Sequence, residues 1–292
     1  MKRLITKAIL IIALISLVAT LAVGFTACSG EKDPDKLYVG LECAYSPFNY
    51  TQRDDSNGAV QIYSTNYRPV RRSFANGYDV MVAKKIAEQL GKELVIVKME
   101  WDALVPAVKA GSVDLIIAGM SPTAERKEEI DFSDAYYQSN LVLVVRKDGK
   151  YANATSLESF RGATIAAQQG TFHDKALEEQ GPDHGIIRHT PLSDFPALIN
   201  ALNTKAIDAY VAEEPGAIEN CASNPDFTYI HLKNNSTGFN ATEEDTAIAV
   251  GIKKGSSLTA QINAILSKIS QTERDQMMEQ AIKLSSGSNI VE

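Results

Sequence analysis

"ALVPAVKAGSVDLIIAGMSP" (residues 103–122) contains, in order, a helical pattern, a glycine turn, a short apolar strand and a polar tip that ends in proline. "ALINALNTKAIDAYVAEEP" (residues 197–215) has the same order, with "NTK" in place of the glycine turn, and an aspartate precedes the strand in both stretches. Such segments are typical of βα units. Two interpretations remain open. Either all βα units look alike, or two similar lobes present their strand ends to one cleft, where open α/β sheets bind ligands.

Strands and helices alternate along the rest of the chain. Apolar runs predict strands at residues 36–42, 92–99, 113–119, 139–148, 163–169, 185–190, 206–213, 227–232 and 246–255. Apolar residues at helical spacing predict helices at residues 78–91, 101–111, 156–162, 171–181, 194–205, 257–270 and 272–284. This alternation predicts an α/β fold with parallel sheets, and the restart of the pattern after residue 139 favours two lobes. The polar residues 49–76, with the basic run "YRPVRR", are interpreted as an exposed hairpin or loop insertion.

The first residues have the features of an export signal. Lys2, Arg3 and Lys7 precede an apolar run at residues 8–24, and "FTACSG" follows it. A membrane-spanning anchor is the alternative, because about 17–25 apolar residues can cross a bilayer. The ending resembles the lipobox of bacterial lipoproteins, with Phe25 where leucine is usual. Residues 1–27 would then be a signal peptide, Cys28 the acylated residue, and the polar residues 28–35 a tether to the membrane.

Charge and residue counts exclude several classes of protein. The formal charge is −7, and it would become −10 after cleavage before Cys28, because three basic and no acidic residues precede that position. An acidic chain argues against nucleic acid and against attraction to anionic lipid. Cys43 and Cys221 form no disulfide framework, although two thiols could pair, and the four histidines have no metal-ligand spacing. We therefore expect no metal, no cofactor and no catalytic residue.

The polar tip of the first stretch has the chemistry that a free carboxylate requires. In "SPTAER", Ser121 can cap a helix, Pro122 fits its first position, and Arg126 can fold back over an anion bound at the helix start. The alternative is an ordinary capped helix with a surface arginine. The facing tip "YVAEEP" offers Glu213 for an ammonium group, since strand alternation turns one of its two glutamates into the cleft.

Two aromatic side chains lie where the apolar part of such a ligand would bind. "YSPF" offers Tyr45, and Trp101 begins a predicted helix between two acidic residues. Packing in the core is the alternative for a lone tryptophan, but the flanking charges favour a position at the rim.

These motifs together resemble the bacterial extracellular solute-binding proteins, family 3, which feed polar amino acids to ABC importers. The resemblance covers about residues 36–284 and depends on "YSPF", "NGYDV", "WDALVPAVKAGSVDLIIAGMSPTAERKEEIDFSDAYY", "QQGTF" and "AIDAYVAEEP". It implies the type II periplasmic-binding-protein fold, with two α/β lobes joined by two crossover strands. The implied lobes are residues 36–139 with 244–292, and residues 140–243.

The resemblance also implies the ligand contacts. Tyr45 and Trp101 would sandwich the ligand side chain, Arg126 would pair with the α-carboxylate, and Glu213, where many relatives have aspartate, would take the α-ammonium. The remaining implied binding residues are Glu42, Gly119, Met120, Ser121, Gln169, Thr171 and Phe172.

Glu42 at the end of the first strand favours a cationic ligand such as lysine or arginine, through ion-pair and cation–π contacts. Glutamine or another polar amino acid is the open alternative, because Glu42 can also accept an amide N–H. Ala118 and Phe172 depart from relatives that bind basic amino acids. We expect a monomeric, lipid-anchored receptor outside the cytoplasm, on the outer face of the membrane or in a periplasm, that closes on its ligand and delivers it to a permease. The rivals are a dehydratase-type enzyme on the same fold and a sensory module, which lacks its usual second apolar span here.

Overall fold

The computed structural model describes residues 32–286. By its internal contacts the chain divides into Met1–Lys32 and Asp33–Glu292, and the second unit contains the fold. The predicted signal peptide, Cys28 and the first residues of the tether lie outside the described residues. Within residues 32–286, no helix has the length and apolar character needed to cross a membrane.

Within the described residues, nine strands form the larger sheet. In spatial order they are β2 (Ala44–Tyr45), β3 (Asn49–Gln52), β5 (Pro69–Asn76), β4 (Val60–Tyr63), β6 (Glu93–Lys98), β1 (Lys36–Leu41), β7 (Leu115–Ile116), β14 (Ala247–Ile252) and β8 (Asp131–Gln138). Its helices are α2 (Tyr78–Leu90), α3 (Leu104–Ala110), α4 (Ala124–Glu129), α8 (Glu243–Thr246) and α9 (Leu258–Leu266), with short 3₁₀ turns η1 (Ser56–Gly58) and η2 (Trp101–Ala103). We call this sheet with its helices lobe 1.

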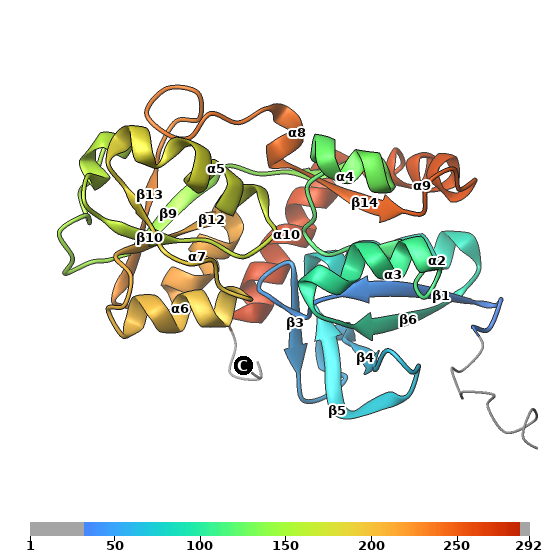
Figure 1. Ribbon diagram of the computed structural model, residues 1–292. Helices are drawn as coiled ribbons and strands as arrows, with labels where there is room; N and C mark the ends of the chain where they lie inside the picture. Colours follow the sequence, from blue (N-terminus) through green and yellow to red (C-terminus); the bar gives the residue numbers. More distant parts are fainter. Residues whose placement is uncertain (1–31, 287–292) are drawn as a thin grey trace, which may run out of the picture. The chain divides into compact units, whose positions relative to one another are not determined.

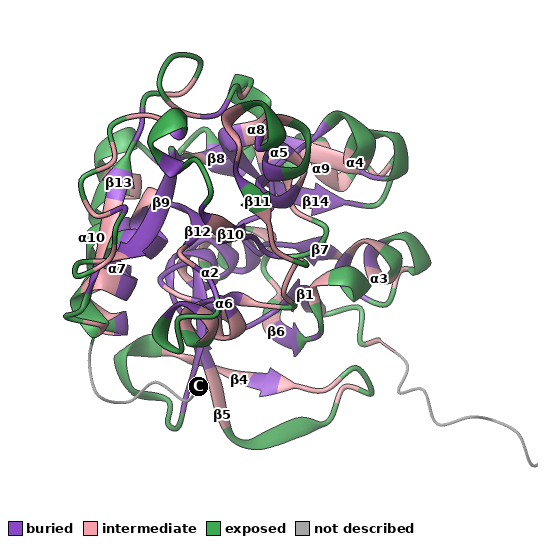
Figure 2. Ribbon diagram, turned by 60° about the vertical axis from the view of Figure 1, so that its left-hand side comes forward, coloured by how far each residue is buried: buried purple, intermediate pink, exposed green. Residues whose placement is uncertain are grey.

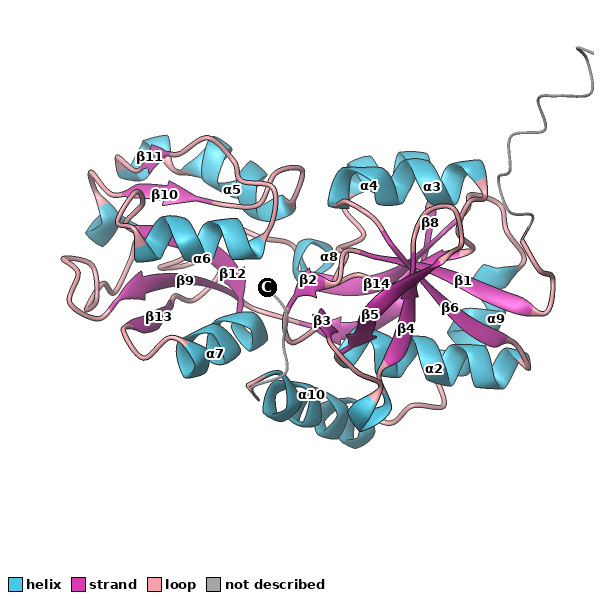
Figure 3. Ribbon diagram, turned by 90° about the horizontal axis from the view of Figure 1, so that it is seen from below, coloured by secondary structure: helices cyan, strands magenta, loops and turns pink. Residues whose placement is uncertain are grey.

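Five strands of the described chain form the second sheet, which with its helices is called lobe 2. In spatial order they are β11 (Ile187–Arg188), β10 (Thr164–Ala166), β12 (Ala209–Glu213), β9 (Leu141–Arg146) and β13 (Phe227–His231). Its helices are α5 (Phe172–Gln180), α6 (Phe195–Asn203) and α7 (Glu214–Ser223), with 3₁₀ turns η3 (Leu157–Phe160) and η4 (Pro182–His184). Figure 3 shows the two sheets, each with its own helices.

Both sheets are mixed, so the prediction of parallel sheets is only partly right. β1 pairs parallel with β6 and β7, and β10 pairs parallel with β11 and β12. β14 pairs antiparallel with β7 and β8 in lobe 1, and β9 pairs antiparallel with β12 and β13 in lobe 2. β9 and β14 are the strands that the chain adds on entering lobe 2 and on returning to lobe 1. The predicted α/β class itself is confirmed.

The central strands are buried on both faces because helices cover each side of a sheet. Residues 37–41 of β1, all of β14 and all of β12 are buried, which explains why these strands read as continuous apolar runs. Figure 2 shows the buried strands inside and the exposed outer faces of the helices. This burial gives the ends of β1 and β12, where the candidate residues Glu42 and Glu213 lie, rigid supports.

Residues 49–76 are only in part the exposed hairpin or insertion that their polarity predicted. β3 is buried at all four positions, and β4 pairs parallel with β6 inside the sheet. The exposed parts are residues 53–58 after β3 and the tip of the antiparallel hairpin of β4 and β5. The polar side chains misled the prediction because they are hydrogen-bonded in the interior: Asn76 Nδ2 donates to Gln52 Oε1 at 3.1 Å.

The chain passes between the lobes at two neighbouring places. The first passage is at Ser139 and Asn140, between β8 and β9, and the second leads from β13 through α8 to β14. The two passages are tied together, because Ser139 N donates to Thr246 O at 3.0 Å. The last helix, α10 (Gln271–Ser285), packs against α2 of lobe 1 and α7 of lobe 2 (Figure 1).

Candidate functional site

A small cavity lies where the strand ends of the two lobes meet. Its volume is about 20 Å³, which is room for about one water molecule. The lining residues come from both lobes: Tyr45, Trp101, Gly119, Ser121, Arg126, Gln168, Thr171, Phe172, His173, Phe195 and Glu213. The lobes are therefore closed on one another, and an amino acid can enter only if they open or these side chains move.

Gly119 and Ser121 form the lobe 1 wall. Gly119 has φ +63°, and a Cβ there would lie 3.0 Å from the Tyr45 ring, so glycine lets the backbone approach the cavity closely. The turn is anchored from below by Asp79, whose carboxyl accepts a hydrogen bond from the Gly119 backbone.

The prediction that Ser121 caps the following helix is wrong. α4 begins at Ala124, and its cap is Thr123, whose side chain accepts from Arg126 N at 3.4 Å. Ser121 instead uses its carbonyl oxygen to accept from Arg126 Nη1 at 2.8 Å. Ser121 also lines the cavity.

Arg126 bridges the two lobes. Besides its bond to Ser121, its Nη2 donates to the carbonyl of Gly170 in lobe 2 at 2.9 Å. The guanidinium lies 5.1 Å from the centroid of the Trp101 ring, a cation–π distance. Burial lowers the pKa of Arg126 to about 10, which leaves the group charged at neutral pH. A charged guanidinium at the cavity wall can bind a carboxylate. The carboxylate oxygens would then replace the carbonyl oxygens of Ser121 and Gly170 as its hydrogen-bond acceptors.

The aromatic residues are arranged differently from the predicted sandwich. The Tyr45 ring stacks on Phe195 of lobe 2 at 4.2 Å and on Phe48 at 5.0 Å. Trp101 is half-buried at the rim, as predicted, and its Nε1 donates to Gly170 O at 3.4 Å. Tyr45 and Trp101 therefore do not face each other across free space in this conformation, because Phe195 and Arg126 occupy the ring faces.

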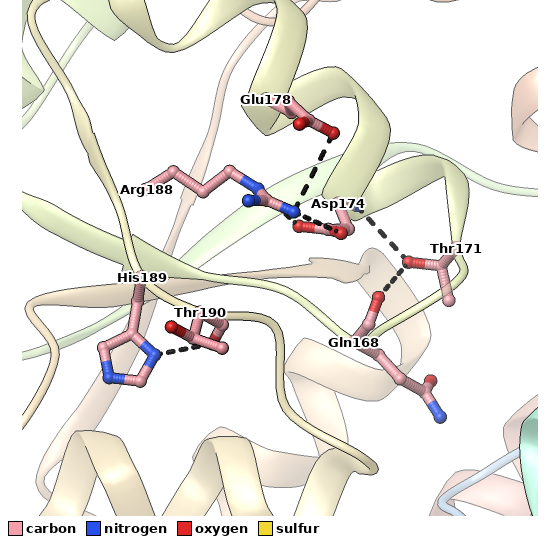
Figure 4. A network of polar contacts seen from close by, with 7 residues as sticks. All are labelled: Gln168, Thr171, Asp174, Glu178, Arg188, His189 and Thr190. Carbon is pink, nitrogen blue, oxygen red and sulfur yellow. Dashed lines mark hydrogen bonds and ion pairs between the residues drawn. The ribbon is translucent and has the colours of Figure 1, made fainter.

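The lobe 2 loop before α5 is held by a polar network, which Figure 4 shows. Thr171 caps α5 by accepting from Asp174 N at 3.4 Å, and its hydroxyl donates to Gln168 O at 2.7 Å. Arg188 makes a bidentate contact with Asp174, at 2.8 Å to each oxygen. The network fixes the start of α5, so Thr171, Phe172 and His173 are presented to the cavity from a rigid support.

Glu213 and His173 form a buried pair on the lobe 2 wall. His173 Nε2 lies 2.9 Å from Glu213 Oε1, and both side chains are 7% exposed. Burial raises the pKa of Glu213 to about 8, and burial together with the charge of Arg126 lowers the pKa of His173 to about 4. As alternation predicted, the neighbouring Glu214 points elsewhere, toward Asn140 and His231.

Glu42 lies behind the cavity and does not line it. Its two carboxylate oxygens accept from Gln168 Nε2 at 3.0 and 3.2 Å, so Gln168 stands between Glu42 and the cavity. Gln168 also donates to Ser193 O at 3.0 Å. Burial raises the pKa of Glu42 to about 7. A cationic ligand would meet Glu42 only after Gln168 turns aside.

Besides Glu42, two predicted residues do not line the cavity. Met120 is buried in the core, and its carbonyl accepts from Ala249 N at 3.0 Å. Gln169 is exposed at the rim, where its side chain donates to Asp102 of lobe 1 at 2.9 Å. Gln169 therefore contributes to closure of the lobes.

Three lining residues were missing from the predicted set: Gln168, His173 and Phe195. Gln168 could have been found by continuing the alternation of β10, which turns Gln168 inward and Gln169 outward. Phe195 could have been found from its place in the first turn of a helix, directly after the cap Asp194. Arg126 also lies in the first turn of a helix that follows a strand. No local signal identifies His173, because its partner Glu213 is distant in sequence.

A wider groove continues from the cavity to solvent between α4 and α5. Arg126, Gly170, Thr171 and Phe172 belong to its wall, and an ion pair between Glu125 and Lys175 crosses it from lobe 1 to lobe 2. The groove is therefore the solvent side of the same cleft.

The described residues were also compared with the requirements of a metal site and of a disulfide. Among residues 32–286, no group of three or more histidine, cysteine or acidic residues is placed to hold a metal ion. Cys43 and Cys221 of this part of the chain are free thiols.

The raised pKa values predict that stability falls as pH rises. Glu42, Asp79 and Glu213 have folded-state pKa values of about 7, 7 and 8, above the usual value of about 4. Folding therefore favours their protonated forms. This stabilisation is fully present below the usual pKa of about 4, is lost as pH rises from there through 7 and 8, by at most about 1.4 kcal/mol per pH unit for each group, and changes little at higher pH. We expect the melting temperature to fall between pH 6.5 and 8.5.

Calorimetry over that range measures this effect, which His173 opposes only near the lower end of the range. The lowered pKa of His173 removes stability only as pH falls below its usual value of about 6.5. Glu213→Gln removes one titrating group and should make the slope shallower. A melting temperature that is constant or rises from pH 6.5 to 8.5 would contradict the prediction.

The chain was compared with protein families and with known proteins, and it matches proteins that bind solutes. Residues 37–283 match the family model described as bacterial extracellular solute-binding proteins, family 3. The chain is similar to an arginine-binding extracellular protein, ArtP, of Bacillus subtilis, with 28% identity over 89% of this chain and 91% of that protein. It is also similar to a glutamine-binding protein, GlnH, of the same organism, with 26% identity over 95% of this chain and 98% of that protein.

A solved structure has the same fold. An amino-acid ABC transporter substrate-binding protein of Streptococcus pneumoniae, bound to L-arginine, matches with a TM-score of 0.71 and 27% identity, over 87% of this chain and 97% of that one. The predicted type II periplasmic-binding-protein fold is thereby confirmed. The family match covers nearly the whole described chain, and the chain belongs to the bacterial extracellular solute-binding proteins, family 3.

Proposed function

We propose that this protein binds a free amino acid with a cationic side chain, such as arginine or lysine, between its lobes and delivers it to an ABC importer permease. The observation that carries the proposal is the placement of Arg126 and Glu213 on opposite lobes of one buried cavity. These groups match the α-carboxylate and α-ammonium that every amino acid carries. Closure brings both together, so a ligand that contacts both favours the closed lobes.

The cationic side chain is supported by the buried carboxyl of Glu42 and by the relatives described as arginine-binding. Glutamine is the second candidate. Gln168 covers Glu42 and presents an amide to the cavity, and one relative is described as glutamine-binding. The relatives are binding proteins, which supports a binding role over the dehydratase-type enzyme.

A thermal-shift screen against the twenty amino acids, ornithine and cystine tests the ligand class. A ligand at one hundred times its Kd stabilises the protein by about 2.7 kcal/mol, which for a chain of this size raises the melting temperature by about 5–10 °C. We expect arginine, lysine or ornithine to give the largest shift. If glutamine alone shifts the transition, the cationic class is wrong, and if no amino acid does, the proposed function is wrong.

We also propose that residues 1–27 are a cleaved signal, that Cys28 carries a lipid, and that residues 28–35 tether a monomeric receptor to the membrane. The support is the charged, apolar and Thr-Ala-Cys order of the first residues. We further propose that lobe 1 comprises residues 36–139 and 244–292, and that lobe 2 comprises residues 140–243.

Replacing Cys28 by serine tests the lipid anchor. In a bacterial host fed labelled palmitate, we expect the unmodified chain to carry label and to sediment with membranes. The variant should lose the label and leave the membrane fraction. A Cys43→Ser variant is the matched control. If the Cys28→Ser protein still carries label, the lipid is attached at another residue and the assignment of Cys28 is wrong.

A further inference from the structure

The buried pair of His173 and Glu213 has a second feature beyond its 2.9 Å contact. Within the described part of the chain, neither His173 Nδ1 nor Glu213 Oε2 has a hydrogen-bond partner, although both atoms are buried. Buried polar atoms are normally paired, so two orphans in one pair that lines the cavity mark a place where a ligand contributes hydrogen bonds.

The groups that face this pair come from both lobes. Arg126 of α4 is the cation whose charge acts on His173, and the Tyr45 hydroxyl, also without a partner in the described chain, lies on the lobe 1 side. Glu214 follows Glu213 in the chain but bonds to His231, and Glu42 lies behind Gln168. With a cation opposite and little solvent, a positively charged His173 is disfavoured, and a neutral imidazole remains.

A neutral imidazole bonded to a carboxyl group has two arrangements. When Glu213 is protonated, its hydroxyl donates to Nε2, and Nδ1 carries the imidazole hydrogen. When Glu213 is ionised, Nε2 carries the hydrogen and donates to Oε1, so Oε2 and Nδ1 both become acceptors. An ammonium group is a donor in all directions. In the first arrangement it would meet the Nδ1–H donor and an uncharged carbonyl oxygen, whereas in the second both atoms accept and Glu213 carries a negative charge, so the ammonium favours the second.

We propose that the α-ammonium of the ligand binds this pair by displacing one proton from it, and that His173 is the positioning residue that holds Glu213 Oε1 and leaves Oε2 for the ligand. The carboxyl proton of Glu213 passes to Nε2 of His173, the Nδ1 proton leaves to solvent, and Glu213 gains one negative charge. This inference rests on the proposed function, because it requires a ligand with an α-ammonium group. It predicts that binding tightens with pH.

Titration calorimetry with L-arginine at pH 6, 7 and 8 tests the displaced proton. Because the protonated pair must ionise below the folded-state pKa of Glu213, the Kd is expected to fall about tenfold per pH unit from pH 6 toward pH 8. Repeating the titration at pH 6 in buffers of different ionisation enthalpy should show release of about one proton per ligand.

An arginine analogue that lacks the α-amino group is the matched ligand control. It keeps the carboxylate and the guanidinium, so any titration of Glu42, whose pKa also lies near neutrality, affects both ligands equally. We expect the analogue to bind with a Kd that changes much less over this range. An equal slope for the two ligands, or a Kd for L-arginine that is constant from pH 6 to 8, overturns the proposal.

Variants at position 173 test the positioning role. His173→Leu should weaken L-arginine binding about tenfold or more, and His173→Gln, which still donates to Glu213, should restore most of that loss, whereas the analogue should bind all three proteins alike. Circular dichroism checks that each variant is folded. If His173→Leu and His173→Gln bind L-arginine equally, the positioning role is wrong.

The chain offers a matched control pair away from the cleft. His184 Nδ1 lies 2.9 Å from Glu158 Oε1 on the exposed surface of lobe 2, so His184→Gln removes a similar contact. That variant should keep the affinity and the pH slope of the unmodified protein. If no amino acid binds at any pH, the proposed function fails and this inference with it, which is a different result from binding that does not depend on pH.

Discussion

Replacing Arg126 by alanine is expected to weaken the binding of any free α-amino acid by about two to four orders of magnitude. The guanidinium would give two charge-assisted hydrogen bonds to the α-carboxylate, worth about 1.5–3 kcal/mol each. No other arginine or lysine lines the cavity in the described residues. Titration calorimetry with arginine, lysine and glutamine measures the loss.

Two further variants make the result specific. Arg126→Lys keeps the charge but loses the planar fork, so it should bind with intermediate affinity. Arg53→Ala removes an exposed arginine of the same lobe and should leave binding unchanged. If Arg126→Ala binds as well as the Arg53 control, the carboxylate is held by another group and the assignment of Arg126 is wrong.

Replacing Asp79 by alanine is expected to lower the free energy of unfolding by about 2–6 kcal/mol. Asp79 accepts from Tyr136 OH at 2.7 Å and from Asn49 Nδ2 at 2.8 Å, and it is fully buried at the start of α2. Alanine leaves these two buried side-chain donors without an acceptor, at about 1–3 kcal/mol each, and also removes the acceptor of the Gly119 backbone N–H. Urea unfolding at pH 6.5 measures the change.

A double variant separates lost hydrogen bonds from other effects. Tyr136→Phe removes one of the stranded donors, so Asp79→Ala with Tyr136→Phe should be less destabilised than the sum of the two single variants. Asp55→Ala, at an exposed position of lobe 1, is the control for loss of an aspartate. Strict additivity in the double variant would show that the hydrogen bond contributes little.

The predicted elements are mostly present because their signals are local. α2 follows the spacing of its apolar residues and ends at Gly91, which has the left-handed φ of +65° that favours glycine at a helix end. α4 shows the limit of such signals. Ser121 and Thr123 are both residue types that cap helices, and only the structure shows that Thr123 is the cap of α4.

Residues 49–76 show a second limit. Sequence polarity predicted exposure, but Asn49 is bonded to Asp79 and Asn76 to Gln52 inside the protein. A polar side chain can be buried when it has a hydrogen-bond partner, and here the partner comes from an element elsewhere in the chain.

The sequence by itself determined the α/β class, and it predicted that Arg126 and Glu213 lie at strand ends facing one cleft, where both line the cavity. The class follows from periodicity, which acts over a few neighbouring residues, whereas the ligand roles of the two charged residues came from the family resemblance and stay a proposal. Only the tertiary structure decided the partners: Phe195 against Tyr45, His173 against Glu213, and Gln168 against Glu42, which are 126 positions apart. Such pairs depend on which side chains the closed lobes bring within a few ångströms and on how far they exclude water, and neither is encoded in the local pattern.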